Sequence, residues 1–200
     1  LKELAAAVLQ ENRLRYREIK TFGTPRRLTL YVCGLAEVQD PLVQEVRGPA
    51  VKVAFNQAGE PTRAALGFAK SQGVEVKDLV IKSVGPVEYV FAVLRQEGRP
   101  AMEVLPQICP ALISGLHFPK PMRWGNLEVR FARPIRWLLA LYGSEVVEFT
   151  YAGLRSGRVT YGHRFLSRGP LEVEHAAHYF EIMEKGRVVV DHRARREMIW

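Results

Sequence analysis

Short segments with strand and helix periods follow one another along this chain, and their mixture limits the folds that it can adopt. Within residues 26–38 (RRLTLYVCGLAEV), residues 27–32 alternate apolar and polar side chains like a half-buried strand, and 79–84 with 88–96 read as a hairpin. Residues 2–14 and 62–73 instead place apolar side chains at helical spacing. Because the strands and helices follow no regular β-α-β order, the sequence predicts an α+β fold with mixed or antiparallel sheets and flanking helices.

The segment 120–143 (KPMRWGNLEVRFARPIRWLLALYG) combines arginines with two tryptophans. Its pattern predicts a strand at 127–131 and a helix that starts at Pro134 and ends at Gly143. Pro106 and Pro110 predict that a helix at 101–116 is kinked or shortened. Further elements are predicted as strands at 43–46, 145–151 and 187–190, and as helices at 174–186 and 192–200.

The periods also predict which side chains form the core. We expect the following to be buried: Leu28, Leu30, Val32, Val129, Phe131, Trp137 and Leu138. Segment 120–143 is therefore interpreted as aromatic core on one side and arginines on the other.

The chain has 200 residues and a net charge of +8, which favours a polyanionic partner. No apolar run approaches the roughly 20 residues of a membrane helix, and there is no signal peptide. Cys33 and Cys109 lie far apart without a CxxC motif, which argues for a reducing compartment and against a cysteine zinc site.

Sequence motifs of the common catalytic sites are missing. The chain has no GxxxxGK, GxGxxG or GxSxG motif. His175 and His178 could share a helix face, but no third metal ligand is evident, so a solvated helix face is favoured. We therefore predict no catalytic residue and no metal site in this chain.

Positive charge gathers between Phe149 and Leu171, where the sequence has no acidic residue. Arginine forks fit phosphate oxygens, so these side chains are candidates for contacts to a nucleic-acid backbone. The alternative is that they bond carbonyls and acids within the fold. With the arginines of segment 120–143, the candidates are Arg155, Arg158, His163, Arg164, Arg168, Arg123, Arg130 and Arg133.

Several ordered sequence blocks resemble the N-terminal part of the beta subunit of bacterial glycyl-tRNA synthetase. They are TPRRL (24–28), RGPA (47–50), GEPTRAALGFAKSQGV (59–74), PKPMRWG (119–125), RFARPIRWLLALYG (130–143) and GHRF (162–165). One position departs from the family pattern, since Arg136 stands where histidine is expected in RPxxW. Together with a start at Leu1 and a helix that runs to Trp200, the resemblance predicts a fragment, residues 1–200, of a longer subunit. Within it we expect two lobes, 1–115 and 116–200.

The resemblance implies a cytoplasmic glycine–tRNA ligase of two alpha and two beta subunits. The class II alpha subunit would use ATP and Mg²⁺, and this part of the beta subunit would bind no cofactor of its own. The expected role is accessory: binding tRNA(Gly) and assembling with the alpha subunit, without a membrane. The alternatives are an editing-like hydrolase, similar to a domain of phenylalanyl-tRNA synthetase, and a purely structural assembly domain.

Overall fold

The computed structural model describes all residues from Leu1 to Trp200, which form two compact units. Unit 1 consists of residues 1–39 and 99–200, and unit 2 consists of residues 40–98. This division differs from the lobes 1–115 and 116–200, because residues 40–98 form a sheet and helices of their own. The α+β fold class is confirmed, since helices occur together with several small sheets that are antiparallel or mixed.

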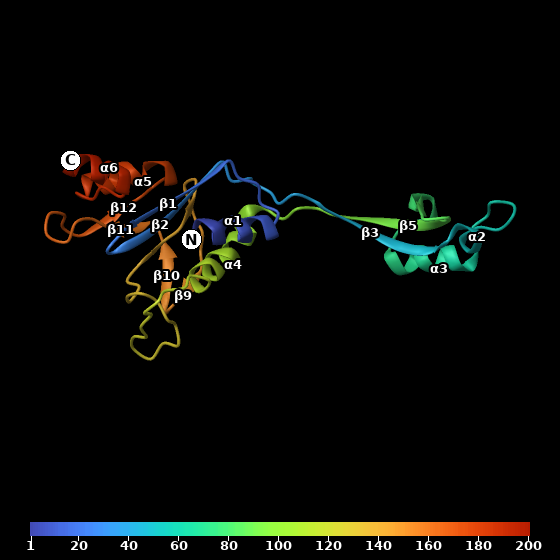
Figure 1. Ribbon diagram of the computed structural model, residues 1–200, viewed down its shortest axis with the longest axis horizontal. Coiled ribbons are helices and arrows are strands. Elements are labelled where there is room, and N and C mark those ends of the chain that lie inside the picture. Colours follow the sequence, from blue (N-terminus) through green and yellow to red (C-terminus); the bar gives the residue numbers. More distant parts are fainter. The chain divides into compact units, whose positions relative to one another are not determined.

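Unit 1 combines helices with short strands around one long hairpin (Figure 1). In the hairpin, β1 (Glu18–Thr24) pairs antiparallel with β2 (Arg27–Cys33), so that Ile19 lies opposite Val32. The other elements are α1 (Lys2–Glu11), α4 (Ala101–Ser114), β6 (Leu138–Leu139), β7 (Leu141–Tyr142), β8 (Glu145–Val146), β9 (Thr150–Tyr151), β10 (Leu154–Gly157), β11 (Val159–Tyr161), β12 (Pro170–Glu172), the 3-10 turn η2 (Ala176–His178), α5 (Tyr179–Lys185) and α6 (His192–Ile199).

Two hydrophobic clusters hold unit 1 together. In the larger cluster, buried Leu9 of α1 and Ile108 of α4 pack with Ile19 of the hairpin. The smaller cluster lies around Val173 and Met183, which are both 0% exposed, and partly buried residues of β6 and β7 reach it. The short strands after residue 137 therefore connect the two clusters.

Helix α4 runs through Pro106 and Pro110 without interruption, so the predicted shortening at these prolines is wrong. Each proline removes one backbone donor from the helix. The helix nevertheless buries Val104, Leu105 and Ile108 along one face. Tertiary packing of an apolar face supplies most of the stability of a helix in a protein, and here it outweighs the missing donors.

The segment after Pro134 is not a helix, and the strand predicted at 127–131 is also wrong. Met122 and Phe131 form an isolated bridge, while the apolar run that follows enters two different sheets. Strand β6 pairs parallel with β10, and β7 pairs antiparallel with β8 across a turn in which Gly143 has a φ of +60°. A short apolar run satisfies both helix and strand periods, and here partners distant in sequence decided between them.

The remaining predictions have mixed outcomes. The helices predicted from 2–14, 62–73 and 192–200 are present as α1, α3 and α6. The strand predicted at 145–151 is present only at its ends, and the helix predicted at 174–186 begins as η2 and continues as α5. No strand forms at 187–190.

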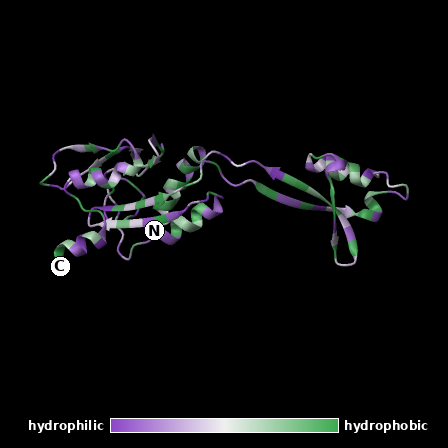
Figure 2. Cartoon of the chain, turned by 90° about the horizontal axis from the view of Figure 1, so that it is seen from above, coloured by the Kyte–Doolittle hydropathy of each residue, from purple (hydrophilic) through white to green (hydrophobic).

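Unit 2 is a three-stranded antiparallel sheet in the order β3-β5-β4, with helices packed along it (Figures 1 and 2). Its elements are β3 (Leu42–Ala50), α2 (Val51–Ala54), α3 (Arg63–Gln72), η1 (Val76–Asp78), β4 (Val80–Val84) and β5 (Val87–Gln96). The strand predicted at 43–46 thus exists, but it is longer and pairs with β5. Gly73 ends α3 with a φ of +69°, as a left-handed helix cap does.

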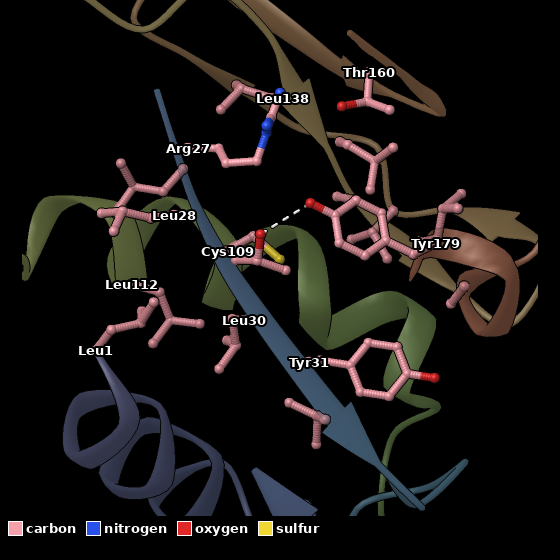
Figure 3. Close-up of a pocket in the computed structure, with 18 of the residues that line it drawn as sticks. Leu1, Arg27, Leu28, Leu30, Tyr31, Cys109, Leu112, Leu138, Thr160 and Tyr179 are labelled. Atoms are coloured by element: carbon pink, nitrogen blue, oxygen red, sulfur yellow. Dashed lines mark hydrogen bonds between the residues drawn. The ribbon is translucent and has the colours of Figure 1, made fainter. Parts of the chain in front are cut away.

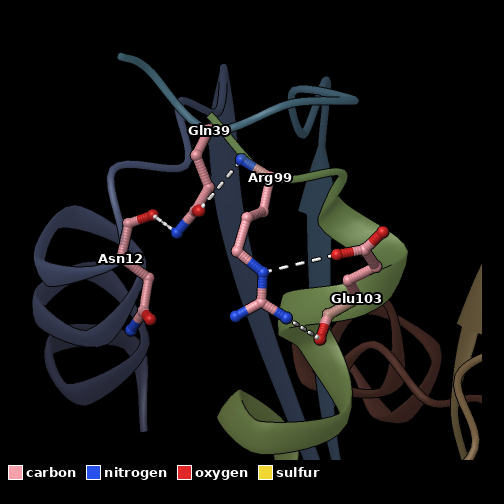
Figure 4. Close-up of polar contacts among 4 residues, drawn as sticks. All are labelled: Asn12, Gln39, Arg99 and Glu103. Atoms are coloured by element: carbon pink, nitrogen blue, oxygen red, sulfur yellow. Dashed lines mark hydrogen bonds and ion pairs between the residues drawn. The ribbon is translucent and has the colours of Figure 1, made fainter. Parts of the chain in front are cut away.

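Hydrogen bonds join the two segments at which the chain leaves unit 1 and returns to it (Figure 4). The Gln39 amide donates to the Arg99 carbonyl at 3.0 Å, and the Arg99 amide donates to the Gln39 side chain at 3.2 Å. The buried Gln39 amide group also donates to the Asn12 carbonyl at 2.7 Å. Arg99 is held in turn by Glu103, 3.3 Å away. The two ends of the inserted unit 2 therefore leave unit 1 from adjacent backbone positions.

Candidate functional site

Unit 1 holds an open cleft of about 1230 Å³. Strand β2 and helix α4 contribute to its wall, together with segment 131–143 and the residues near Tyr179 (Figure 3). Ligand sites in proteins are commonly concave, with apolar walls and few polar groups. This cleft is therefore the first candidate for a functional site.

The floor of the cleft is made of side chains that the sequence predicted as core. Leu28 is 50% exposed, so its predicted burial is wrong. The other six predicted core residues are only partly buried, and most of them also line the cleft. The alternation of β2 marked an apolar face correctly: Leu30 and Val32 pack against the larger hydrophobic cluster and also border the open cleft, whereas Leu28 is half exposed there.

The polar groups of the cleft lie around Arg27 (Figure 3). Its guanidinium donates to the Tyr161 carbonyl at 2.7 Å and lies 6.0 Å from the centre of the Trp137 ring. Burial lowers the pKa of Arg27, and its Nε has no hydrogen-bond partner. Burial also raises the pKa of Tyr179, whose hydroxyl lies 3.0 Å from that of Thr29. The cleft thus holds a partly desolvated cation that no carboxylate compensates.

Cys109 also lines the cleft, but its chemistry is that of a buried thiol. Burial raises its pKa to about 11. The thiolate is the nucleophilic form, so near neutral pH this side chain is almost entirely the unreactive thiol. We assign Cys109 a packing role on α4.

Three of the predicted contact residues have acidic partners within the fold. Arg155 lies 2.8 Å from Glu148, and Arg123 lies 3.4 Å from Glu128. Arg158 donates to the Ser144 carbonyl at 3.2 Å and to the Glu174 carbonyl at 3.4 Å, with Glu172 at 3.9 Å. Glu148 and Glu172 flank the acid-free segment 149–171, whereas Glu128 lies five residues after Arg123.

The other predicted residues have no ion pair in the structure. His163 accepts the amides of Phe165 and Leu166 through Nδ1, each at 3.2 Å, and so orders the turn that follows β11. The guanidinium of Arg164 lies 5.3 Å from the centre of the Phe165 ring. Arg168 and Arg130 are exposed. Arg133 is exposed at the cleft, which Arg164 also lines.

Four arginines of the cleft were not among the predicted contact residues, namely Arg17, Arg26, Arg27 and Arg136. Arg17 directly precedes β1, Arg26 lies in the turn between β1 and β2, and Arg27 begins β2. Arg136 lies in the irregular segment before β6. Arg26 and Arg27 belong to the block TPRRL, and Arg136 belongs to the block RFARPIRWLLALYG. Only the fold brings these blocks, more than a hundred residues apart, to one cleft.

The histidine pair does not lie on the face of one α-helix, because His175 precedes η2 in extended conformation and His178 ends it. His175 accepts the Ala177 amide at 3.0 Å and so caps η2, while its ring centre lies 5.7 Å from that of His178. In the described residues, 1–200, no group of three or more His, Cys, Asp or Glu side chains could hold a metal ion.

A family model described as glycyl-tRNA synthetase beta subunit matches residues 1–200. The chain belongs to this family. It is 58% identical to the glycine–tRNA ligase beta subunit of Desulforamulus reducens and 57% identical to that of Desulforudis audaxviator, in both cases over the whole chain. The corresponding protein of Moorella thermoacetica is 55% identical over 98% of the chain. The chain spans about 29% of the length of these relatives.

The family blocks can now be placed on the glycyl-tRNA synthetase beta subunit fold. GEPTRAALGFAKSQGV forms α3 and its flanks in unit 2. In unit 1, TPRRL and the block from Arg130 to Gly143 supply much of the cleft wall. None of the helices combines the length and the apolar character that crossing a membrane requires.

Proposed function

We propose that this chain is part of an accessory subunit of a glycine–tRNA ligase, which binds tRNA(Gly) and assembles with a catalytic alpha subunit. Membership of the beta subunit family carries this proposal. The holoenzyme would be a cytoplasmic class II ligase with two alpha and two beta subunits. ATP and Mg²⁺ would be used on the alpha subunit, and this chain would supply no catalytic residue.

The charge of the chain supports the tRNA-binding part of the proposal. The net charge is +8, and Arg168 and Arg164 are exposed without an acidic partner. Phosphate contacts by arginine release counterions, and their strength depends on salt. Arg155 and Arg158 already have partners within unit 1, so they are weaker candidates for such contacts.

The test is tRNA(Gly) binding by the alpha–beta holoenzyme across a salt series. Replacing Arg168 by alanine should lower the slope of log affinity against log salt by about 0.7 to 0.9, the value for one phosphate contact. The matched variant Arg155→Ala should leave the slope unchanged and lower the melting temperature slightly, because it leaves Glu148 unpaired. If the alpha subunit charges tRNA(Gly) normally in the absence of the beta subunit, the proposal is refuted.

A further inference from the structure

The cleft of unit 1 has an unusual balance of charge. Six arginines line it, and no aspartate or glutamate does. They are Arg17, Arg26, Arg27, Arg133, Arg136 and Arg164. None of the six forms an ion pair, whereas Arg123, Arg155 and Arg158 outside the cleft lie within 4.0 Å of carboxylates. A concave surface lined by one sign of charge concentrates ligands of the opposite sign.

Arg27 shows that this charge is not neutralised inside the fold. Burial lowers the pKa of Arg27, Tyr179 raises it and the like-charged Arg26 lowers it further, and the Tyr161 carbonyl accepts from its Nη2. Buried charges in proteins are ordinarily paired, because desolvation without a counter-charge is unfavourable. An anion in the cleft would supply the missing counter-charge.

The apolar part of the cleft favours a ligand that has apolar or aromatic surface as well as negative charge. Leu28, which is 50% exposed, and the partly buried Leu30 present aliphatic surface from β2. The Trp137 ring lies on the facing segment, 5.2 Å from the Tyr161 ring. Nucleobases stack on aromatic rings such as that of Trp137, and proteins that bind single strands combine such rings with a basic groove.

The size of the cleft favours a segment of several nucleotides over a small anion. The cleft measures about 1230 Å³, above the range of roughly 300 to 1,000 Å³ for sites of drug-sized ligands. Its arginines come from three separate places in unit 1, namely the β1–β2 hairpin with Arg17 directly before it, residues 133–136, and the loop after β11. Several phosphates along a strand could meet such spaced cations, whereas a single phosphate would meet only one group of them.

We propose that this cleft binds an unpaired segment of RNA, with bases against Leu28, Leu30 and Trp137 and phosphates at Arg26, Arg136 and Arg164. The inference rests on the proposed tRNA-binding function and names the RNA feature that unit 1 recognises. A base-paired helix presents its phosphates outside and its bases stacked inside, so it would not reach the apolar floor.

The first experiment uses the alpha–beta holoenzyme with a fluorescent single-stranded hexaribonucleotide and with a duplex of the same sequence. The wild type should bind the single strand more tightly. The double variant Arg26→Gln/Arg136→Gln should reduce the salt slope for the single strand by about 1.4, two contacts at about 0.7 each. The control Arg187→Gln/Arg193→Gln removes the same charge from exposed positions outside the cleft and should leave the slope unchanged.

A second variant tests the apolar floor without relying on arginine. Leu28→Asp places a negative charge on a side chain that is already half exposed, so the fold should tolerate it. It should reduce single-strand binding at least tenfold, since a carboxylate would repel phosphate. Unchanged binding by this variant and by the arginine double variant, in a protein with normal circular dichroism, overturns the proposal.

The outcomes also separate this inference from the proposed function. If the holoenzyme binds tRNA(Gly) but the cleft variants change neither hexanucleotide nor tRNA binding, the cleft proposal fails and the accessory role stands. If tRNA(Gly) itself does not bind the beta subunit in the holoenzyme, the proposed function fails as well. If the cleft variants instead prevent association with the alpha subunit and leave RNA binding intact, the cleft is a protein-docking surface and the proposal is wrong.

Discussion

At the scale of single residues, Ser156 joins the strands of unit 1 through one buried hydroxyl. Its Oγ donates to the Val147 carbonyl at 2.7 Å and accepts the Phe149 amide at 2.8 Å, and the residue is 6% exposed. Ser156→Ala should lower the free energy of opening at this site by about 1 to 3 kcal/mol, because it leaves buried backbone groups without partners. Hydrogen exchange of the Phe149 amide measures this. The exposed Ser144→Ala is the control, and equal protection in both variants would contradict the prediction.

At the scale of elements, the packing of α3 against β3 in unit 2 can be tested at two glycines. A Cβ at Gly48 would lie 2.5 Å from the Phe68 ring, whereas a Cβ at Gly67 would meet nothing within 4 Å. Gly48→Ala should therefore destabilise unit 2 by about 1 to 3 kcal/mol through overpacking. Gly67→Ala, in the same helix as Phe68, should stabilise it by about 0.5 to 1 kcal/mol, because alanine favours the helix. Urea unfolding measures both changes, and a shift of the same sign in both variants would refute this account of the packing.

At the scale of the whole molecule, unit 2 behaves as an insertion into unit 1. Gln39 and Arg99 are hydrogen-bonded neighbours, and the Ala101 amide donates to the Glu37 carbonyl at 2.7 Å. Replacing residues 40–98 by a short glycine linker should therefore leave unit 1 folded, since the linker spans only a short distance. Circular dichroism and a cooperative thermal transition measure the outcome. A control deletion of residues 101–114, which removes α4 from the core, should abolish that transition. If the chain without residues 40–98 also loses the transition, unit 2 is not an insertion that unit 1 can fold without.

The sequence by itself determined the elements whose signals are local. The alternation of residues 27–32 predicted β2, the spacing of residues 2–14 predicted α1, and Gly73 predicted the end of α3. These signals hold because side-chain period and backbone freedom depend on neighbours in the chain. The blocks of residues that suggested the family were equally local, and the family match confirmed them.

Only the tertiary structure decided the pairing of the short strands and the surroundings of the arginines. Residues 138–142 became strands because β10 and β8 pair with them, and α4 kept its prolines because its apolar face is buried. The sequence placed Arg155 and Arg164 in the same basic segment. In the fold, Arg155 pairs with a carboxylate, whereas Arg164 lines a cleft that has no carboxylate. Contacts between residues distant in sequence carry these differences, and no local pattern records which distant groups the fold will bring together.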